Sequence, residues 1–366
     1  MEFTDKRTAD FLSTHLADLG WNSFFESYFA EFKQTGLLPA RVVEEFKGFY
    51  RLRSAQAEYL AETAGKLQHL AASREDLPAV GDWVAITARP EEGRARIEHT
   101  LPRRTKLSRK VAGREMSEQI VATNLDTVFV VSALNREFNL RRIERYLTIV
   151  WDSGARPVVL LNKADLCPDA AARAADVEGI ALGTPVHLLS ALEKTGLEAV
   201  RECLTRGTTA AFVGSSGVGK STIINGLADA ALPVQTVREH DDRGQHTTTS
   251  RQMIFLSGGG MLIDTPGMRE LQLWNHEQGA TIAFDDIATL SQGCKFRDCG
   301  HRGEPGCAVA AAVQQGELSR ERLENYRKLL AELRFQERKM NPEVARQVKE
   351  EWKKIHKAMR KPPERF

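Results

Sequence analysis

The sequence has no long apolar run. Its apolar-rich stretches, such as residues 128–133 and 157–161, are far shorter than the roughly 20 residues that a membrane-spanning helix needs. The first residues also lack the apolar segment of a secretory signal. We therefore expect a cytoplasmic protein with no membrane partner.

Cysteine is scarce, and no sign of charge dominates. The 366 residues include five cysteines, and the formal net charge is +2. Three of the cysteines fall between positions 294 and 307, which favours a metal site over a disulfide framework. The apolar fraction of 42% and the charged fraction of 27% are ordinary for globular proteins and exclude disordered, collagen-like and rod-like chains. The length corresponds to two or three domains of roughly 150 residues each.

The first 112 residues carry two different patterns. Aromatic and leucine side chains recur at near-helical spacing through residues 1–38, which predicts a helical N-terminal extension. We expect this extension to pack on its own chain, and a partner-binding helix is the alternative. Residues 39–112 contain short strand-like runs between turn residues and predict a small OB-type β-barrel. These runs are residues 42–53, 58–68, 82–88, 94–101 and 106–110.

A basic strip follows the last strands of this predicted barrel. Residues 94–114 hold eight basic residues and one acidic residue. A solvated face is one interpretation, but on a barrel of this kind such a strip is typical of contact with a nucleic-acid backbone. The basic residues are Arg94, Arg96, Arg103, Arg104, Lys106, Arg109, Lys110 and Arg114.

Apolar strand-like runs alternate with helix-like stretches through residues 113–278. This alternation predicts a mixed or parallel sheet with crossover helices, whose ligands bind where the strands end. Residues 279–366 have little strand signal, and we expect a helical domain that ends in a basic helix. The strand-like runs are residues 127–133, 157–161, 186–189, 210–213, 253–256 and 261–263.

A phosphate-binding loop follows the run at residues 210–213. The pattern is G-x-x-x-x-G-K-S, in which glycines let backbone N–H groups face phosphate oxygens. Lys220 supplies a positive charge to the β- and γ-phosphates, and the Ser221 hydroxyl is a ligand for Mg²⁺. The helix after the loop directs its positive N-terminus at the same phosphates. The predicted phosphate-binding residues are Gly214, Ser215, Ser216, Gly217, Val218, Gly219, Lys220, Ser221 and Thr222.

A second motif selects the base. Asn162, Lys163, Ala164 and Asp165 form N-K-A-D directly after a predicted strand. The Asp165 carboxylate can accept hydrogen bonds from guanine N1–H and the 2-amino group. Adenine offers no such pair of donors, so an ATPase is the weakest interpretation. Asn162 braces the loop, and Lys163 covers the base. Ser190 and Ala191 end another strand, where a backbone N–H can reach guanine O6.

A third motif, D-T-P-G, supplies groups for the metal and the γ-phosphate. Asp264 is predicted to hold Mg²⁺, and the Gly267 N–H to sense the γ-phosphate. A polar loop between the phosphate loop and this motif contains three consecutive threonines, residues 247–249. A hydroxyl from this run, assigned to Thr248, completes the predicted Mg²⁺ shell with Ser221 and Asp264.

The cysteine cluster has the composition of a structural zinc site. Cys294, Cys299, His301 and Cys307 offer three thiolates and one imidazole, which suits tetrahedral Zn²⁺ with no open position. Three ordinary thiols beside an unrelated histidine are the alternative interpretation.

The order of these motifs indicates a circular permutation. The N-K-A-D motif precedes the phosphate loop, whereas common GTPases have the reverse order. A sheet can accommodate this change because domain termini often lie close together. The combined pattern over residues 40 to about 330 resembles the circularly permuted GTPases that act in assembly of the bacterial small ribosomal subunit. The N-terminal 38 residues lie outside this resemblance.

The resemblance implies a multidomain α/β protein with three familiar parts. These are an OB-type barrel, a circularly permuted P-loop GTPase domain and a C-terminal α-helical zinc-binding domain. It further implies GTP or GDP with Mg²⁺, one structural Zn²⁺, hydrolysis stimulated by the 30S subunit, and binding to 16S rRNA by a monomer. The predicted division of the chain is 1–38, 39–112, 113–278 and 279–366.

The D-T-P-G motif is not followed by the glutamine that usually orients the attacking water. Met268 stands after Gly267, where Ras-like enzymes have Gln, and a thioether cannot orient water. The resemblance places His246 in the loop beside the threonines, where a neutral imidazole can position or deprotonate water. Together with Lys220 and Thr248, His246 is our catalytic candidate, and a solvent-exposed loop histidine is the alternative.

Two further functions fit the same motifs. One is a GTPase that acts on tRNA or on translation factors, because the basic barrel suits either partner. The other is a non-catalytic RNA-binding scaffold that uses GTP as a structural ligand, which Met268 supports.

Overall fold

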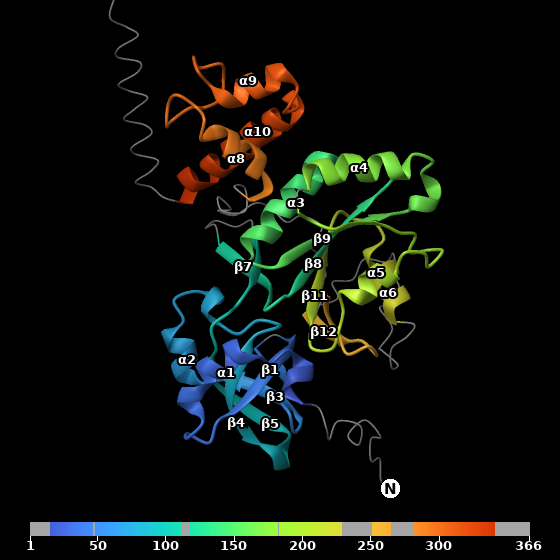
Figure 1. The fold of residues 1–366 in the computed structure, drawn as a ribbon. Helices are drawn as coiled ribbons and strands as arrows, with labels where there is room; N and C mark the ends of the chain where they lie inside the picture. Colours follow the sequence, from blue (N-terminus) through green and yellow to red (C-terminus); the bar gives the residue numbers. More distant parts are fainter. Residues whose placement is uncertain are drawn as a thin grey trace, which may run out of the picture.

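The computed structural model describes residues 15–46, 48–111, 117–181, 183–228, 251–264 and 282–340. Figure 1 shows three parts: a barrel in blue and cyan, a sheet with helices in green and yellow, and a group of orange and red helices. Among the described residues, no helix is both long enough and apolar enough to cross a membrane.

The N-terminal segment forms short helical pieces instead of the single helix that its spacing predicts. A 3₁₀ turn over Leu16–Leu19 precedes α1 (Ser23–Phe29), which is followed by a second turn at Ala30–Phe32. The indole of Trp21 meets that of Trp83 edge-on, with 4.7 Å between ring centroids. Phe25 and Phe29 are buried in the same cluster. The described part of this segment therefore packs on its own chain.

The barrel is closed by β1 (Leu38–Glu45), which pairs with β2 (Tyr50–Arg53) on one side and β4 (Trp83–Arg89) on the other. The order β1-β2-β3-β5-β4 completes the circuit through β3 (Glu58–Thr63) and β5 (Arg94–Thr100). The short helix α2 (Gly65–Leu70) follows β3. A closed five-stranded barrel of this kind is OB-like. Its core includes Ala40, Val42, Leu52, Tyr59, Ile86 and Ile97.

Three details of the predicted strands are wrong. Residues 42–53 form two strands because Gly48, with φ of +85°, turns the chain between them. The run at 58–68 ends earlier, where α2 begins. The strand at 106–110 is real, but it lies outside the barrel: β6 (Lys106–Val111) pairs with β7 (Ser117–Thr123) in a separate hairpin. Sequence periodicity marks a strand without identifying its partner.

The central sheet has the order β10-β9-β8-β11-β13-β12. Five strands are parallel, and β12 runs antiparallel to β13. The edge strand β12 also pairs with β1, opposite Glu44 and Glu45, so the sheet continues into the barrel. The strands are β8 (Thr127–Ala133), β9 (Arg156–Asn162), β10 (Val186–Leu188), β11 (Thr209–Val213), β12 (Arg251–Phe255) and β13 (Met261–Asp264).

Helices cover both faces of this sheet. Strand β8 shows the alternation: Val128 and Val130 enter one buried cluster, and Phe129 and Val131 enter the other. Because side chains alternate along a strand, a strand covered on both faces reads as a continuous apolar run. The first cluster includes α3 (Leu140–Asp152) and α4 (Ala170–Ile180), and the second includes α5 (Glu198–Glu202) and α6 (Lys220–Ala228).

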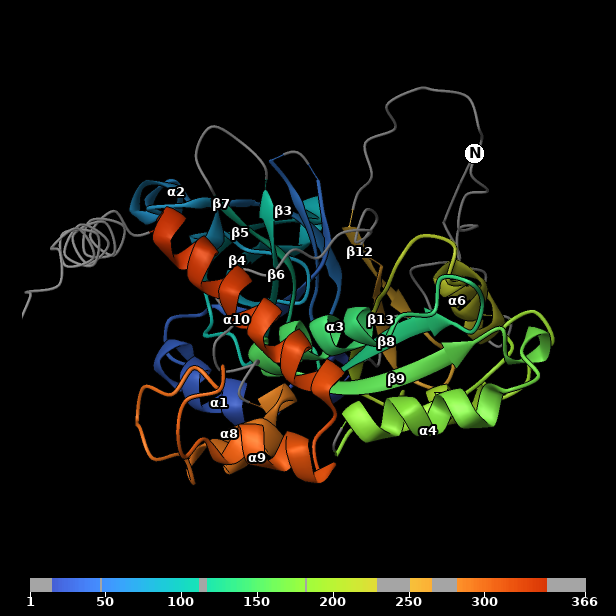
Figure 2. The ribbon, with the colours of Figure 1, turned by 90° about the horizontal axis from the view of Figure 1, so that it is seen from above.

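The C-terminal helices share the core of α3. Phe284 and Leu323 belong to the same buried cluster as Ile143, and Figure 2 shows α10 crossing α3. Leu333 of α10 is buried in this cluster as well. The predicted basic helix at the C-terminal end lies outside the described residues. The helices are α8 (Asp285–Ser291), α9 (Ala308–Gln315) and α10 (Arg320–Met340).

Arg322 fastens these helices to α3. Its buried guanidinium lies 2.9 Å from a carboxylate oxygen of Glu144 on α3 and 2.5 Å from one of Asp286 on α8. Asn325 donates a further hydrogen bond of 3.0 Å to Glu144. Buried charges are costly unless they are paired and hydrogen-bonded, so this triad requires one arrangement of the three helices.

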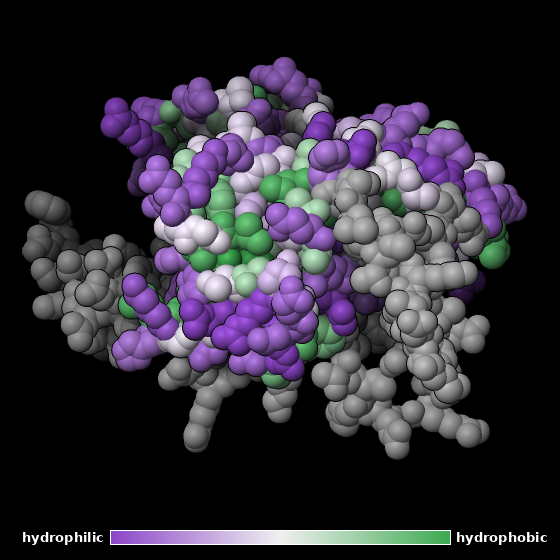
Figure 3. Space-filling view, turned by 90° about the horizontal axis from the view of Figure 1, so that it is seen from below, coloured by the Kyte–Doolittle hydropathy of each residue, from purple (hydrophilic) through white to green (hydrophobic). Residues whose placement is uncertain are grey.

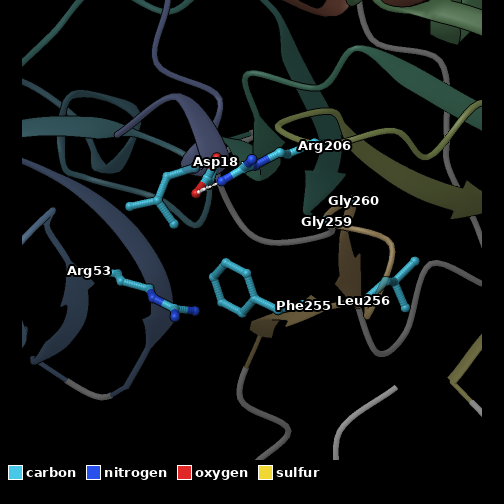
Figure 4. Close-up of a pocket in the computed structure, with 8 residues that line it drawn as sticks. Asp18, Arg53, Arg206, Phe255, Leu256, Gly259 and Gly260 are labelled. Atoms are coloured by element: carbon cyan, nitrogen blue, oxygen red, sulfur yellow. Dashed lines mark hydrogen bonds and ion pairs between the residues drawn. The ribbon is translucent and has the colours of Figure 1, made fainter. Parts of the chain in front are cut away.

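Arg41 on β1 connects three other segments of the chain. Its fully buried guanidinium donates to the carbonyl oxygens of Leu19, Gly81 and Asn124, which lie in the N-terminal segment, before β4 and after β7. A cavity of about 160 Å³ opens beside this junction (Figure 4), where Asp18 and Arg206 form an ion pair.

Candidate nucleotide site and metal centre

The predicted phosphate loop connects β11 to α6, and its backbone needs glycine. Gly214 and Gly219 have φ of +147° and +99°. A Cβ at Gly214 would lie 2.3 Å from the Val131 carbonyl oxygen, and one at Gly219 would lie 2.2 Å from Asn162 Nδ2. Larger residues are therefore excluded at both positions by conformation and by space.

The loop surrounds a lysine. Lys220 Nζ donates to the carbonyl oxygens of Gly214 and Ser215, each over 2.7 Å. Ser221 and Thr222 follow in the first turn of α6, and both are exposed. A lysine held against the loop backbone at a helix N-terminus is an arrangement suited to phosphate.

Asn162 joins this loop to the base-selecting motif. Its Nδ2 donates to the Val218 carbonyl oxygen over 2.8 Å, and its Oδ1 accepts from the Ala191 N–H over 2.9 Å. The side chain is buried. One amide thus connects the phosphate loop, the N-K-A-D segment and the Ser190–Ala191 segment. The Ala191 N–H, a candidate donor to guanine O6, is engaged by Asn162 in this structure.

The remaining residues of N-K-A-D project from the end of β9. Lys163 adopts the left-handed conformation with φ of +64°, and Ala164 N–H donates to the Leu189 carbonyl oxygen over 3.1 Å. Asp165 is exposed, so its carboxylate is accessible to a base. Because β9, β8 and β11 are neighbouring parallel strands, the two motifs meet at the carboxyl ends of these strands.

Asp264 lies at the carboxyl end of β13. Its strand is parallel to β11, with Ile263 opposite Ala211, so the carboxylate follows its strand on the side where the phosphate loop begins. His246, Thr248 and Gly267 lie outside the described residues. Their predicted roles in water activation, Mg²⁺ binding and γ-phosphate sensing therefore stay predictions.

The cysteine cluster is assembled in three dimensions. The potential ligand atoms of Cys294, Cys299, His301 and Cys307 all lie within 4.8 Å of one another. His301 Nδ1 lies 3.6 Å from the Cys294 sulfur and 3.5 Å from the Cys307 sulfur, and these sulfurs are 3.9 Å apart. With Zn–S bonds of about 2.3 Å, a tetrahedron has edges of about 3.8 Å. The donor set and its spacing therefore fit zinc.

Neighbouring groups hold these ligands in place. Glu304, which the sequence pattern did not single out, accepts hydrogen bonds from the Gly300 and Arg302 N–H groups at 3.1 and 2.5 Å. Burial lowers the pKa of His301, which favours the neutral imidazole that binds metals. Cys307 is also the N-cap of α9, where its sulfur accepts from the Ala310 N–H.

Two arginines of the predicted basic strip form ion pairs within the protein. Arg103 is largely enclosed and forms a two-point ion pair with the fully buried Asp82, and it also donates to two backbone carbonyl oxygens. Arg104 pairs with Asp126. These arginines stabilise the barrel and its connection to the sheet. Arg94 and Arg96 on β5 are exposed, and Arg96 pairs with Glu98 over 2.7 Å.

Comparison with known proteins places this geometry in a family. Residues 100–274 match the family model described as RsgA GTPase. A curated relative from Opitutus terrae, named small ribosomal subunit biogenesis GTPase RsgA, is 45% identical over 94% of this chain and 97% of its own length.

Solved structures agree with this assignment. The crystal structure of YjeQ from Thermotoga maritima matches 81% of this chain and 98% of its own, with 27% identity and a TM-score of 0.63. The structure of YloQ, described as a circularly permuted GTPase, matches with 25% identity and a TM-score of 0.60 over 81% of this chain and 95% of its own. The barrel, the permuted motif order and the sheet topology are thus those of known proteins, and the chain belongs to the RsgA family of GTPases.

Proposed function

We propose that this protein hydrolyses GTP during assembly of the small ribosomal subunit, and that the subunit stimulates the reaction. The relatives that carry the name small ribosomal subunit biogenesis GTPase support this function. The observation that carries it is the position of Asn162, which connects a guanine-selecting segment to a phosphate loop.

In this proposal the nucleotide lies along one edge of the sheet. Asp165 accepts hydrogen bonds from guanine, Lys163 covers the base, and Lys220 leaves its backbone acceptors for the β- and γ-phosphates. Ser221, Thr248 and Asp264 hold Mg²⁺, which neutralises charge on the phosphate oxygens. The Gly267 N–H reports the presence of the γ-phosphate.

One zinc ion belongs to the cluster of Cys294, Cys299, His301 and Cys307. Four protein ligands leave no position for substrate, so the metal is structural. We also propose the division into residues 1–38, 39–112, 113–278 and 279–366, and a monomeric protein in the cytoplasm.

The barrel is the proposed contact with 16S rRNA. Arg94 and Arg96 are exposed on β5, and the exposed fraction of Tyr28 on α1 is 45%. Cationic and aromatic side chains together suit single-stranded RNA, because they bind the backbone and stack on bases. Figure 3 shows that the face seen from below presents an apolar area bordered by hydrophilic residues.

His246 is the proposed group that positions the attacking water. We expect His246→Ala to lower subunit-stimulated turnover by about 10²–10⁴-fold, the usual contribution of a general base, with unchanged GDP affinity. Stimulated turnover equal to that of the unmodified protein would reject this role.

The function itself is tested by sedimentation and single-turnover hydrolysis. We expect the protein to sediment with purified 30S subunits when a non-hydrolysable GTP analogue is present, and to dissociate with GDP. Binding without hydrolysis on the subunit would favour a scaffold. Equal stimulation by tRNA or by translation factors would favour the other GTPase class.

A further inference from the structure

Helix α3 presents an arginine to the phosphate loop. Arg142 Nη1 donates to the Ser215 hydroxyl oxygen over 2.8 Å. The helix begins at Leu140 after the N-cap Asn139, whose side chain accepts from the Arg142 N–H over 3.1 Å. Ile143 and Leu147 are buried beneath it. The guanidinium therefore projects from a firmly anchored helix start.

The partners of Arg142 differ from those of its neighbours. Arg141 pairs with Glu321, and Arg145 pairs with Glu332. Within the described ranges, no carboxylate lies within salt-bridge distance of Arg142, and its guanidinium donates to a neutral hydroxyl. A cation in the first turn of a helix is also unfavourable for the helix dipole. Its position is thus poorly explained by stability.

Two cationic side chains converge on Ser215. Lys220 Nζ binds the Ser215 carbonyl oxygen over 2.7 Å, while Arg142 binds the hydroxyl of the same residue. Lys220 is the group that meets the β- and γ-phosphates in a loop of this type. Arg142 therefore lies beside the loop in which the phosphate charge is expected.

We propose that Arg142 is a catalytic arginine supplied by the chain itself. In the transition state its guanidinium gives up the hydrogen bond to Ser215 and binds the γ-phosphoryl group. This inference rests on the proposed GTPase function. In the reaction a water oxygen forms a bond to the γ-phosphorus. The bond from phosphorus to the β–γ bridging oxygen breaks, its electron pair stays on GDP, and the water proton passes to phosphate or solvent. The Arg142 guanidinium stabilises negative charge on the oxygens of the transferred phosphoryl group.

The test compares Arg142→Ala with Arg141→Ala, because both truncate adjacent exposed arginines of α3 and only one faces the loop. We expect Arg142→Ala to lower kcat for GTP hydrolysis on 30S subunits by about 10³-fold, with KM and GDP affinity within about twofold. Arg142→Ala should also lose the binding of GDP with aluminium fluoride on the subunit. Arg141→Ala should retain both properties.

A purely structural bond gives a different pattern. In that case Arg142→Lys, which keeps a cationic donor for the Ser215 hydroxyl but lacks the guanidinium, would restore kcat to that of the unmodified protein, and this result would overturn the proposal. Unchanged kcat in Arg142→Ala would also overturn it while leaving the GTPase function intact. Failure of the unmodified protein to hydrolyse GTP on subunits would instead remove the proposed function itself.

Discussion

Asn162 Nδ2 donates a hydrogen bond of 2.8 Å to the carbonyl oxygen of Val218. These residues belong to different motifs, and the order of those motifs in the chain is the reverse of that in common GTPases. The bond shows that the permuted order still brings the N-K-A-D segment to the predicted phosphate loop.

Removing this amide should weaken nucleotide binding. Asn162→Ala leaves the Val218 carbonyl oxygen and the Ala191 N–H without their partner, at a cost of about 1–3 kcal/mol for each buried group. We expect GDP affinity to fall by at least about tenfold in equilibrium titrations. Asn225→Ala, on the exposed side of α6, is the matched control. Equal affinities of the two variants would contradict the bridging role.

Metal content tests the cysteine cluster. We expect one zinc per chain in elemental analysis of the native protein. Cys294→Ser combined with Cys299→Ser should abolish zinc binding, because two of four ligands are lost. Cys167→Ser combined with Cys203→Ser removes the same number of thiols elsewhere and should retain the metal. Zinc that persists in the first double variant would contradict the assignment.

The triad at Arg322 should contribute strongly to stability. Arg322→Ala leaves Glu144 and Asp286 as adjacent carboxylates without their cation, and breaking a buried ion pair in this way costs about 3–5 kcal/mol. We expect a loss of this size in denaturant unfolding. Arg141→Ala, whose pair with Glu321 is exposed, should lose at most about 1 kcal/mol. Similar losses in both variants would argue against the triad.

Glu144 should give stability a specific pH dependence. Burial raises the pKa of its carboxyl group above the ordinary value of 4.5, and Arg322 opposes this shift only in part. Between pH 4.5 and this raised pKa, Glu144 is protonated in the folded protein and ionised in the unfolded chain. The corresponding stability is fully present below pH 4.5 and is lost as the pH rises through the folded pKa.

Urea unfolding over a pH series tests this linkage. We expect the unfolding free energy of the unmodified protein to fall with rising pH relative to that of Glu144→Gln, which cannot titrate. A difference between the two proteins that stays constant across this pH range would mean that Arg322 fully offsets burial.

Much of the fold follows from local pattern. The run at residues 127–133 coincides with β8, because a strand buried on both faces is continuously apolar. The glycine positions of the phosphate loop can also be predicted from the sequence, because Gly214 and Gly219 have conformations and contacts that exclude a side chain.

Other features depend on long-range contacts that no local pattern contains. Arg322 looks in sequence like any arginine of a charged helix, yet it is buried between Glu144 and Asp286. Arg103 counts toward a basic strip, yet its charge is paired with Asp82. These arginines lie 21 to 178 positions from the carboxylates that they contact. Packing determines such pairs, so composition alone cannot distinguish a paired arginine from a solvated one.

Nucleotide preference of Asp165→Asn tests the shared guanine site most directly. The carboxamide offers a donor where guanine also has donors, so we expect affinity to shift from GTP toward xanthosine triphosphate, whereas Asp169→Asn, an exposed aspartate four positions further on, should remain guanine-specific. Titration of both variants with the two nucleotides distinguishes the outcomes. Guanine selectivity retained in Asp165→Asn would contradict the account.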